Sequence, residues 1–105
     1  MVHVLAMLHA GASGLIGLRA YESAVLPILS EYGGQLLSAF VPEGHDQADC
    51  PDEIHLIEFE SREGLQSFRQ DERVVALADK RRTAIASTVT YVSEKLLDYR
   101  FLPGQ

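Results

Sequence analysis

Histidines are the side chains of this sequence best suited to acid–base chemistry near neutral pH. The chain has four of them, His3, His9, His45 and His55. An imidazole titrates close to neutrality, and a half-buried position can tune it for hydrogen bonding or general-base action. His9 and His55 are therefore the candidate catalytic residues. The alternative is that these histidines simply have their hydrogen bonds satisfied at the ends of strands.

The spacing of possible ligands does not predict a metal site. Zinc sites use ligands at short fixed spacings, and the sequence has no HxH, HxxxH or CxxC pattern. His3 and His55 could lie at similar depth on neighbouring strands, but a third ligand would have to lie close by. The acidic stretch 45–52, which contains Cys50, matches no calcium or zinc pattern and is typical of an exposed loop. We therefore expect no metal and no cofactor.

Two charged residues fall on apolar stripes, where an unpaired charge is costly. Arg81 shares the stripe of a helix with Val74, Ala78 and Ile85, and Glu58 lies on an otherwise apolar strand face. The two could form a buried or interfacial ion pair with each other, or they could bind an anionic ligand. Both are therefore candidate substrate-binding residues.

Arg73 is a further candidate for binding a substrate. It lies in the first turn of a helix that Asp71 is expected to cap, so a local ion pair between these two residues is the competing interpretation. Two aromatic residues on strands, Phe59 and Tyr91, complete the candidate substrate-binding set.

Composition and charge exclude several classes of protein. The chain has 105 residues, 47% hydrophobic and 23% charged, which fits one globular domain. The net charge of −6 disfavours nucleic-acid binding, which needs clustered basic residues. No apolar run approaches the roughly 20 residues that span a bilayer, and no signal peptide is recognisable. A single cysteine, Cys50, excludes an intrachain disulfide and indicates a cytoplasmic location.

The charges are unevenly distributed. Residues 41–60 contain seven acids and no lysine or arginine, whereas residues 69–82 contain five bases against three acids. The two segments could be solvated faces of opposite sign that meet between subunits. The basic segment could instead supply an anion site.

Apolar periodicity predicts strands over residues 2–10, 35–41, 53–60 and 88–93. Helices are expected over residues 17–32, bent at Pro27, and from Ser61 to about residue 87, with Ser61 and Asp71 as N-caps. The order β-α-β-β-α-β is that of the ferredoxin-like α+β fold. We expect a four-stranded antiparallel sheet with helices on one face. Its first and third strands should be central neighbours, and their helical crossovers suggest that these two run parallel.

The helices can cover only one face of such a sheet, and the other face still carries apolar residues. A second copy of the sheet is the simplest cover, which predicts a homodimeric α/β barrel. Residues 1–93 form the expected domain. Residues 94–105, apolar up to Phe101 and Leu102, are an extension that packs on its own domain or on the dimer partner.

A family resemblance is carried by residues 52–88, from EIHLIEF to the helix ending AIAST, and by Tyr21, Pro27 and the YGG of residues 32–34. Over residues 2–93 the chain resembles the dimeric α/β-barrel superfamily, in a small bacterial branch known only as a domain of unknown function. The superfamily is related in fold to antibiotic-biosynthesis monooxygenases, muconolactone isomerases and haem-binding dismutases. Because one scaffold supports such different chemistry, the resemblance implies a fold rather than a function.

The functional prediction is a homodimer that binds a small, anionic organic molecule and could act as a cofactor-independent, oxygenase- or isomerase-like enzyme. Its pocket is expected between sheet and helices, lined by Leu5, Met7, Phe40, Phe59, Phe68 and Tyr91, with His9, His55 and Arg81 as polar contacts. The alternative is a non-catalytic dimeric module. No nucleic-acid or membrane partner is expected.

Overall fold

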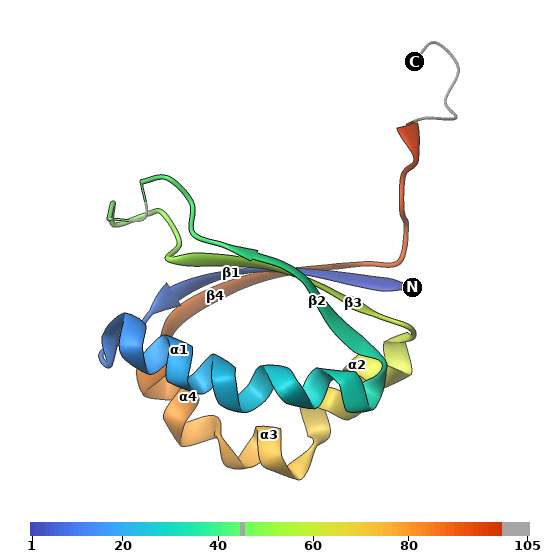
Figure 1. Ribbon diagram of the computed structural model, residues 1–105, viewed down its shortest axis with the longest axis horizontal. Helices are drawn as coiled ribbons and strands as arrows, with labels where there is room; N and C mark the ends of the chain where they lie inside the picture. Colours follow the sequence, from blue (N-terminus) through green and yellow to red (C-terminus); the bar gives the residue numbers. More distant parts are fainter. Residues whose placement is uncertain (45, 100–105) are drawn as a thin grey trace.

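The computed structural model describes residues 1–44 and 46–99 of the chain. Helices cover one side of a four-stranded sheet, and the last described segment leaves the sheet on the other side (Figure 1). The elements are β1 (Val2–Ala10), α1 (Gly14–Val25), η1 (Leu26–Tyr32), β2 (Gly34–Phe40), β3 (Glu53–Phe59), α2 (Arg62–Gln70), α3 (Glu72–Ala76), α4 (Ala78–Ala84) and β4 (Ile85–Ser93). This is the predicted β-α-β-β-α-β order with each helical segment divided.

The strand order is β2-β3-β1-β4, and every neighbouring pair is antiparallel. The prediction that β1 and β3 are the central neighbours is confirmed, but the prediction that they run parallel is wrong. The helical crossover joins β1 to β2, and the loop between β2 and β3 then reverses the chain. As a result His3 lies opposite Glu58 and His55 lies opposite Ala6, so the two histidines lie at different depths in the sheet.

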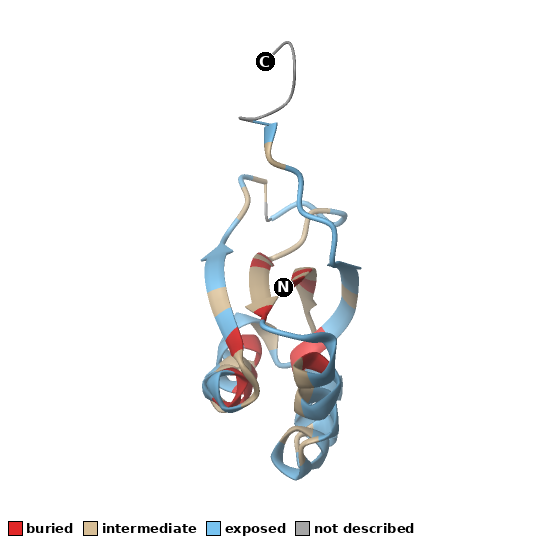
Figure 2. Cartoon of the chain, turned by 90° about the vertical axis from the view of Figure 1, so that its right-hand side faces the viewer, coloured by how far each residue is buried: buried red, intermediate tan, exposed pale blue. Residues whose placement is uncertain are grey.

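The strands turn alternate residues toward the helices, and these residues form the core. One apolar cluster joins Leu8 of β1 to Leu18 and Tyr21 of α1. A second cluster joins Val2 and Phe59 to η1 and α2. Figure 2 shows the buried residues gathered where the sheet meets the helices, with exposed residues on the outer sides. The fold therefore has one well-buried layer, between sheet and helices.

Proline and glycine shape the first helical crossover as the sequence indicates. The α-helix ends at Val25, and the chain continues as a 3₁₀ helix with Pro27 in its first turn, where a missing backbone N–H costs least. Gly33, with φ of 72°, ends this helix in the left-handed conformation that favours glycine. The crossover is thus long enough to lie along the sheet and bring β2 to its edge.

The second crossover begins as predicted and ends earlier. Ser61 accepts a hydrogen bond from Gly64 N at 3.0 Å, and Asp71 accepts one from Arg73 N at 2.8 Å, which confirms both N-caps. The last helix stops at Ala84 rather than near residue 87, because Ile85 is extended and pairs with Ala10 of β1. The β1–β4 ladder therefore takes up residues that helical periodicity had assigned to the helix.

The segment after β4 projects from the sheet on the side away from the helices (Figure 1). Leu96, Leu97 and Tyr99 in it are exposed. The expectations for His45 and for residues 100–105, including Phe101 and Leu102, lie outside the described residues. Among the described residues, no helix has both the length and the apolar character needed to cross a membrane.

Candidate functional site

A cavity of about 140 Å³ lies between the sheet and the helices. Its wall includes Tyr21 and Glu22 of α1, His55 of β3, Phe68 of α2 and Arg81 of α4. A neighbouring pocket of about 400 Å³ shares Tyr21, Phe68 and Arg81 with it. The described structure thus has space in the layer where sequence analysis expects a pocket, and two of the predicted polar contacts, His55 and Arg81, line it.

Four of the predicted pocket residues lie on the opposite face of the sheet. Leu5 and Met7 alternate with the buried residues of β1, and Tyr91 pairs with Leu5. Phe40 lies opposite Ile54, and both Phe40 and Tyr91 are exposed. The prediction that these residues share one pocket with Phe59 and Phe68 is therefore wrong, because alternation along β1 turns Val4 and Ala6, not Leu5 and Met7, toward the pocket that Phe59 lines.

His9 also lies away from the cavity. It belongs to the same face of β1 as Leu5 and Met7, and it lines a surface groove with Cys50, Asp52 and Ser87. His9 therefore does not reach the cavity between sheet and helices and cannot act as a catalytic residue there. The structure separates the two candidate catalytic histidines and leaves His55 as the one that reaches the cavity.

His55 is held between two carboxylates. Its Nε2 lies 2.9 Å from Glu22 Oε2 and 2.9 Å from Glu53 Oε1, and the residue is only 3% exposed. Glu53 in turn accepts a hydrogen bond at 3.2 Å from Arg19 Nε. Ionised carboxylates can only accept hydrogen bonds, so a proton must lie on Nε2 or on one of the carboxyl groups. The cluster therefore holds a proton that it can share.

The environment shifts the pKa values of all three groups. Burial would lower the pKa of His55, but the hydrogen bonds to Glu22 and Glu53 outweigh it, so that pKa is raised. Burial is the main cause that raises the pKa of Glu22. Burial acts in the same direction on Glu53, but its bonds to Glu22, His55 and Arg19 prevail and the pKa of Glu53 is lowered. These shifts favour the charged form of Glu53 and the protonated forms of His55 and Glu22.

Two oxygens near the cavity are buried without a hydrogen-bond partner among the described residues. They are Glu22 Oε1 and the Thr88 hydroxyl oxygen, and both residues line the cavity. Most buried polar atoms in folded proteins have a partner, so a group that binds in the cavity can supply one here. Beside them, burial raises the pKa of Tyr21 while the positive charge of Arg81 opposes that shift.

Glu58 does not meet Arg81. It lies on the face of β3 turned away from the helices, where its Oε2 is 2.9 Å from His3 Nε2, and both side chains are about one quarter exposed. The suggested ion pair between Glu58 and Arg81 is therefore wrong. Alternation along β3 places Glu58 on the opposite side of the sheet from the cavity.

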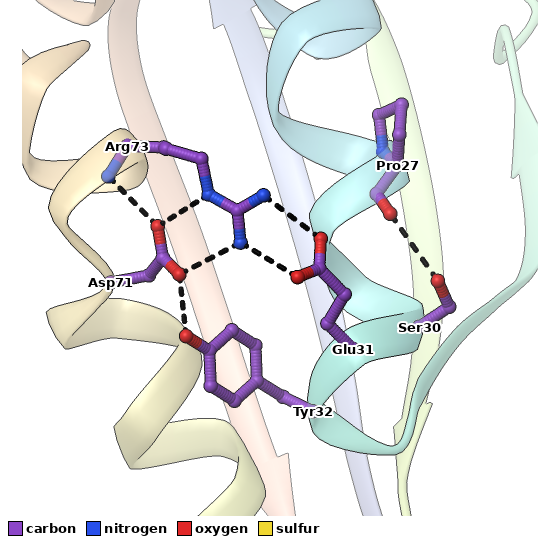
Figure 3. Close-up of polar contacts among 6 residues, drawn as sticks. All are labelled: Pro27, Ser30, Glu31, Tyr32, Asp71 and Arg73. Atoms are coloured by element: carbon purple, nitrogen blue, oxygen red, sulfur yellow. Dashed lines mark hydrogen bonds and ion pairs between the residues drawn. The ribbon is translucent and has the colours of Figure 1, made fainter.

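Arg73 belongs to a separate polar network on the surface of the helix layer (Figure 3). Its guanidinium donates to both oxygens of Glu31, at 2.9 and 3.0 Å, and to both oxygens of Asp71, at 3.0 and 3.1 Å. Tyr32 Oη donates to Asp71 at 2.5 Å. The predicted pair of Arg73 with Asp71 is confirmed, and the network connects η1 to the junction of α2 and α3. The network links helices to one another, and none of its residues lines the cavity.

Sequence reasoning missed Glu22 and Glu53, which hold His55. A signal was present for Glu53, because it lies two residues before His55 on an apolar strand and so shares its face. No pattern connected Glu22 to them, since it lies on a different element and its neighbour Tyr21 accounted for the apolar stripe. Only the packing of α1 on β3 brings the three side chains together.

Comparisons with family models and with curated proteins find no match. Solved structures do match. A protein of unknown function from Rhodopseudomonas palustris has a TM-score of 0.74 at 16% identity, covering 92% of this chain and 83% of that one. An uncharacterized NIPSNAP domain protein from Burkholderia xenovorans has a TM-score of 0.66 at 13% identity, covering 98% and 99%. An antibiotic biosynthesis monooxygenase has a TM-score of 0.66 at 13% identity, covering 92% and 100%.

These likenesses show a shared fold and nothing finer, because the identities are low. The expected relation in fold to antibiotic-biosynthesis monooxygenases is confirmed. No pattern in the sequence pointed to the NIPSNAP domain proteins, one of which shares the fold as well.

Proposed function

We propose that this protein is a homodimer that binds a small anionic organic molecule between the sheet and the helices of each subunit. The observation that carries the proposal is the buried cluster of His55, Glu22 and Glu53, which opens into a cavity that Arg81 also lines. A structural core has no need of this arrangement, since apolar side chains would fill the same space at lower cost.

Arg81 is the proposed contact for the negative charge of the ligand. It lines both the 140 Å³ cavity and the neighbouring 400 Å³ pocket. A guanidinium donates several hydrogen bonds in one plane, which suits a carboxylate or an enolate. Tyr21 and Phe68 add an aromatic wall for the organic part of the molecule.

His55 is the group proposed to exchange a proton with the ligand. A neutral Nε2 can take a proton from an acidic C–H or O–H group, and Glu53 stabilises the imidazolium that forms. This chemistry fits an isomerase- or oxygenase-like reaction on an activated substrate without an organic cofactor. The shared fold with an antibiotic biosynthesis monooxygenase supports it by analogy.

The open face of the sheet supports the proposed dimer. Leu5 and Met7 on β1 share it with Val89 and Tyr91 on β4, and Val89 and Tyr91 are exposed. A second copy of the same face would bury this apolar surface by two-fold symmetry. The segment 94–99 projects on this side with Leu96, Leu97 and Tyr99 exposed, so we propose that the extension packs on the partner. A reducing cytoplasm is the proposed location, given the single Cys50.

Light scattering tests the dimer directly. A mass twice that of the chain at micromolar concentration is expected. In Tyr91→Glu, where a charge would be buried in the proposed interface, the mass should fall to that of a monomer. A wild-type protein that is strictly monomeric would overturn the packing argument.

The alternative function is a non-catalytic dimeric module. The observation in its favour is that Arg73 and Glu58, two of the predicted substrate-binding residues, both form ion pairs within the fold. In a non-catalytic module, side chains of the protein itself would occupy the cavity, and no small molecule would bind there.

A thermal-shift screen with small carboxylates and phenols separates these two functions. We expect anionic members to raise the Tm of the wild type, and to lose that effect in Arg81→Gln. Arg82→Gln is the matched control, because Arg82 pairs with Asp79 on the surface. If no anion raises the Tm of the wild type, or if both variants show the same Tm shift as the wild type, the proposed binding function is wrong. The non-catalytic module would then be the function that remains.

A further inference from the structure

Among the described residues, His55 and the two carboxylates beside it form a group that could hold a metal ion. Glu22, Glu53 and His55 each offer one ligand atom, and the three atoms lie within 4.8 Å of one another. An imidazole nitrogen with carboxylate oxygens is a ligand set that divalent transition metals use in proteins. The spacing rules applied to the sequence do not detect it, because its ligands come from both a helix and a strand.

Two of the three separations are close to those of adjacent positions of an octahedron. His55 Nε2 lies 2.9 Å from Glu22 Oε2 and 2.9 Å from Glu53 Oε1. Ligands about 2.1 Å from a common ion lie ~3.0 Å apart at a right angle and ~3.4 Å apart in a tetrahedron. The two distances from His55 Nε2 lie closer to the right-angle value, and the Glu22 and Glu53 oxygens lie within 4.8 Å of each other. An ion that prefers six ligands, such as Mn²⁺ or Fe²⁺, therefore fits these side chains where they lie.

The local charge favours a cation. Two carboxylates contribute two negative charges, and the Arg19 guanidinium, which donates to Glu53 Oε2 at 3.2 Å, offsets one of them. The one negative charge that remains must be compensated by the shared proton or by a cation, because an uncompensated buried charge is costly. A divalent ion compensates this charge and leaves the site positive toward the cavity.

Glu22 Oε1 is an independent observation that points to a ligand. This oxygen is buried and has no hydrogen-bond partner among the described residues, and the Glu22 side chain is 12% exposed. Buried carboxylate oxygens normally have partners, and a metal ion bound by both oxygens of Glu22 would satisfy this one.

An ion can reach the cluster from solvent. Arg19, Glu22 and Glu53 line an open groove beside α1, while Glu22 and His55 also line the internal cavity. The cluster thus lies between solvent and the cavity. An ion bound there keeps coordination positions for water or for a ligand in the cavity.

We propose that Glu22, Glu53 and His55 bind one divalent transition-metal ion per chain, of the type of Mn²⁺ or Fe²⁺. The lone pair of His55 Nε2 binds either a proton or the ion. In the metal-bound form, the ion rather than His55 therefore contacts the ligand. A second consequence rests on the proposed function: the ion and Arg81 together would hold the anionic molecule. The positive charge of the ion would allow an anion to bind close to the two carboxylates.

Isothermal titration of chelator-treated full-length protein with Mn²⁺ tests the site. We expect one ion per chain in the wild type. Outer-shell changes weaken metal binding about 10- to 100-fold, so losing a direct ligand in Glu22→Gln or His55→Asn should weaken it by at least ~10-fold. His9→Asn and Glu72→Gln make the same replacements outside the cluster and should leave the affinity unchanged.

Two results would overturn the proposal. One is the absence of saturable Mn²⁺ binding to the wild type. The other is an affinity that the cluster variants leave unchanged, which would assign the ion to the acidic loop between β2 and β3.

Paramagnetic broadening of NMR signals by Mn²⁺ tests the wild type alone, in case a cluster variant does not fold. Signals of residues around Glu22 in α1 and His55 in β3 should broaden first. Broadening confined to residues of the β2–β3 loop would refute the site.

The ion site and the anion site can fail separately. Mn²⁺ titration contains no organic molecule, and the thermal-shift screen is run on metal-free protein. Mn²⁺ binding without any anion effect leaves the ion site standing and removes the proposed function. If both occur, added Mn²⁺ should strengthen binding of the anion found in the screen by at least ~10-fold, and an unchanged affinity would refute the coupling between them.

Discussion

The buried cluster of His55, Glu22 and Glu53 and the surface network of Arg73, Asp71 and Glu31 are built from similar charged groups and differ in what they leave unsatisfied. In the surface network the guanidinium of Arg73 bonds both oxygens of both acids (Figure 3). In the buried cluster one oxygen of Glu22 has no partner among the described residues and the cluster opens into a cavity. The first network serves the fold, and the second keeps capacity for a ligand.

The two clusters also differ in how they hold their protons. Arg73 and Tyr32 hold the pKa of Asp71 well below its usual range, so that acid stays ionised in all but strongly acidic solution. In the buried cluster the pKa values of His55 and Glu22 are raised. The Asp71 side chain is only 9% exposed, so pairing with an arginine rather than solvent exposure fixes its charge. Incomplete pairing in the buried cluster gives a proton that can move.

Replacing His55 with leucine should cause the largest loss of stability. The change leaves the carboxylates of Glu22 and Glu53 close together with only Arg19 to compensate them. Removing one partner of a buried ion pair costs about 3–5 kcal/mol. We expect a fall near the lower end in the free energy of unfolding, measured by urea denaturation at pH 6.5.

His3→Leu is the matched control for this change. His3 bonds one partly exposed carboxylate, that of Glu58, so its loss should cost no more than ~1 kcal/mol. If the two leucine variants lost the same stability, burial would not be what distinguishes the cluster.

The free energy of unfolding should fall as pH rises from 5.5 to 8.5. We expect this change to be smaller than the loss in His55→Leu and larger than that in Arg73→Gln. The raised pKa of His55 contributes stability that is fully present below the ordinary value of 6.5 and is lost as pH rises through the folded-state pKa. Glu22 acts in the same direction from its ordinary value of 4.5 upward, and Glu53, whose pKa is lowered, acts in the opposite direction below 4.5. Urea midpoints of chelator-treated wild type should show the fall, and His55→Leu should show a smaller one.

Arg73→Gln should have the smallest effect of the three, because the Arg73 side chain is 54% exposed and solvent screens its ion pairs. The effect of Arg73→Gln on stability should depend on pH in acidic solution. The lowered pKa of Asp71 contributes stability that is present above 3.8 and lost as pH falls. We expect the Tm difference between wild type and Arg73→Gln to shrink below pH 3. Arg62→Gln, which breaks an exposed pair with Glu94, is the control and should change stability by less than ~0.5 kcal/mol.

The fold could largely be predicted because apolar spacing along each segment reports a local property. Alternation identified β1 and β3, and Ser61, Asp71 and Gly33 marked helix ends through their own backbone preferences. The site could be predicted only in part. His55 and Arg81 were found as polar residues on apolar stripes, whereas His9 and Tyr91 were assigned to the wrong face because residue spacing does not say which face the helices cover.

By itself, the sequence determined the element order, the ferredoxin-like class and the positions that break the apolar pattern. These follow from side-chain periods of two and about 3.6 residues, which act within each segment. The tertiary structure decided the antiparallel pairing of β1 with β3, the separation of Glu58 from Arg81, and the meeting of Glu22 with His55. Those contacts depend on how one element packs on another, and the free energy that selects the packing belongs to the whole core rather than to any short stretch of residues.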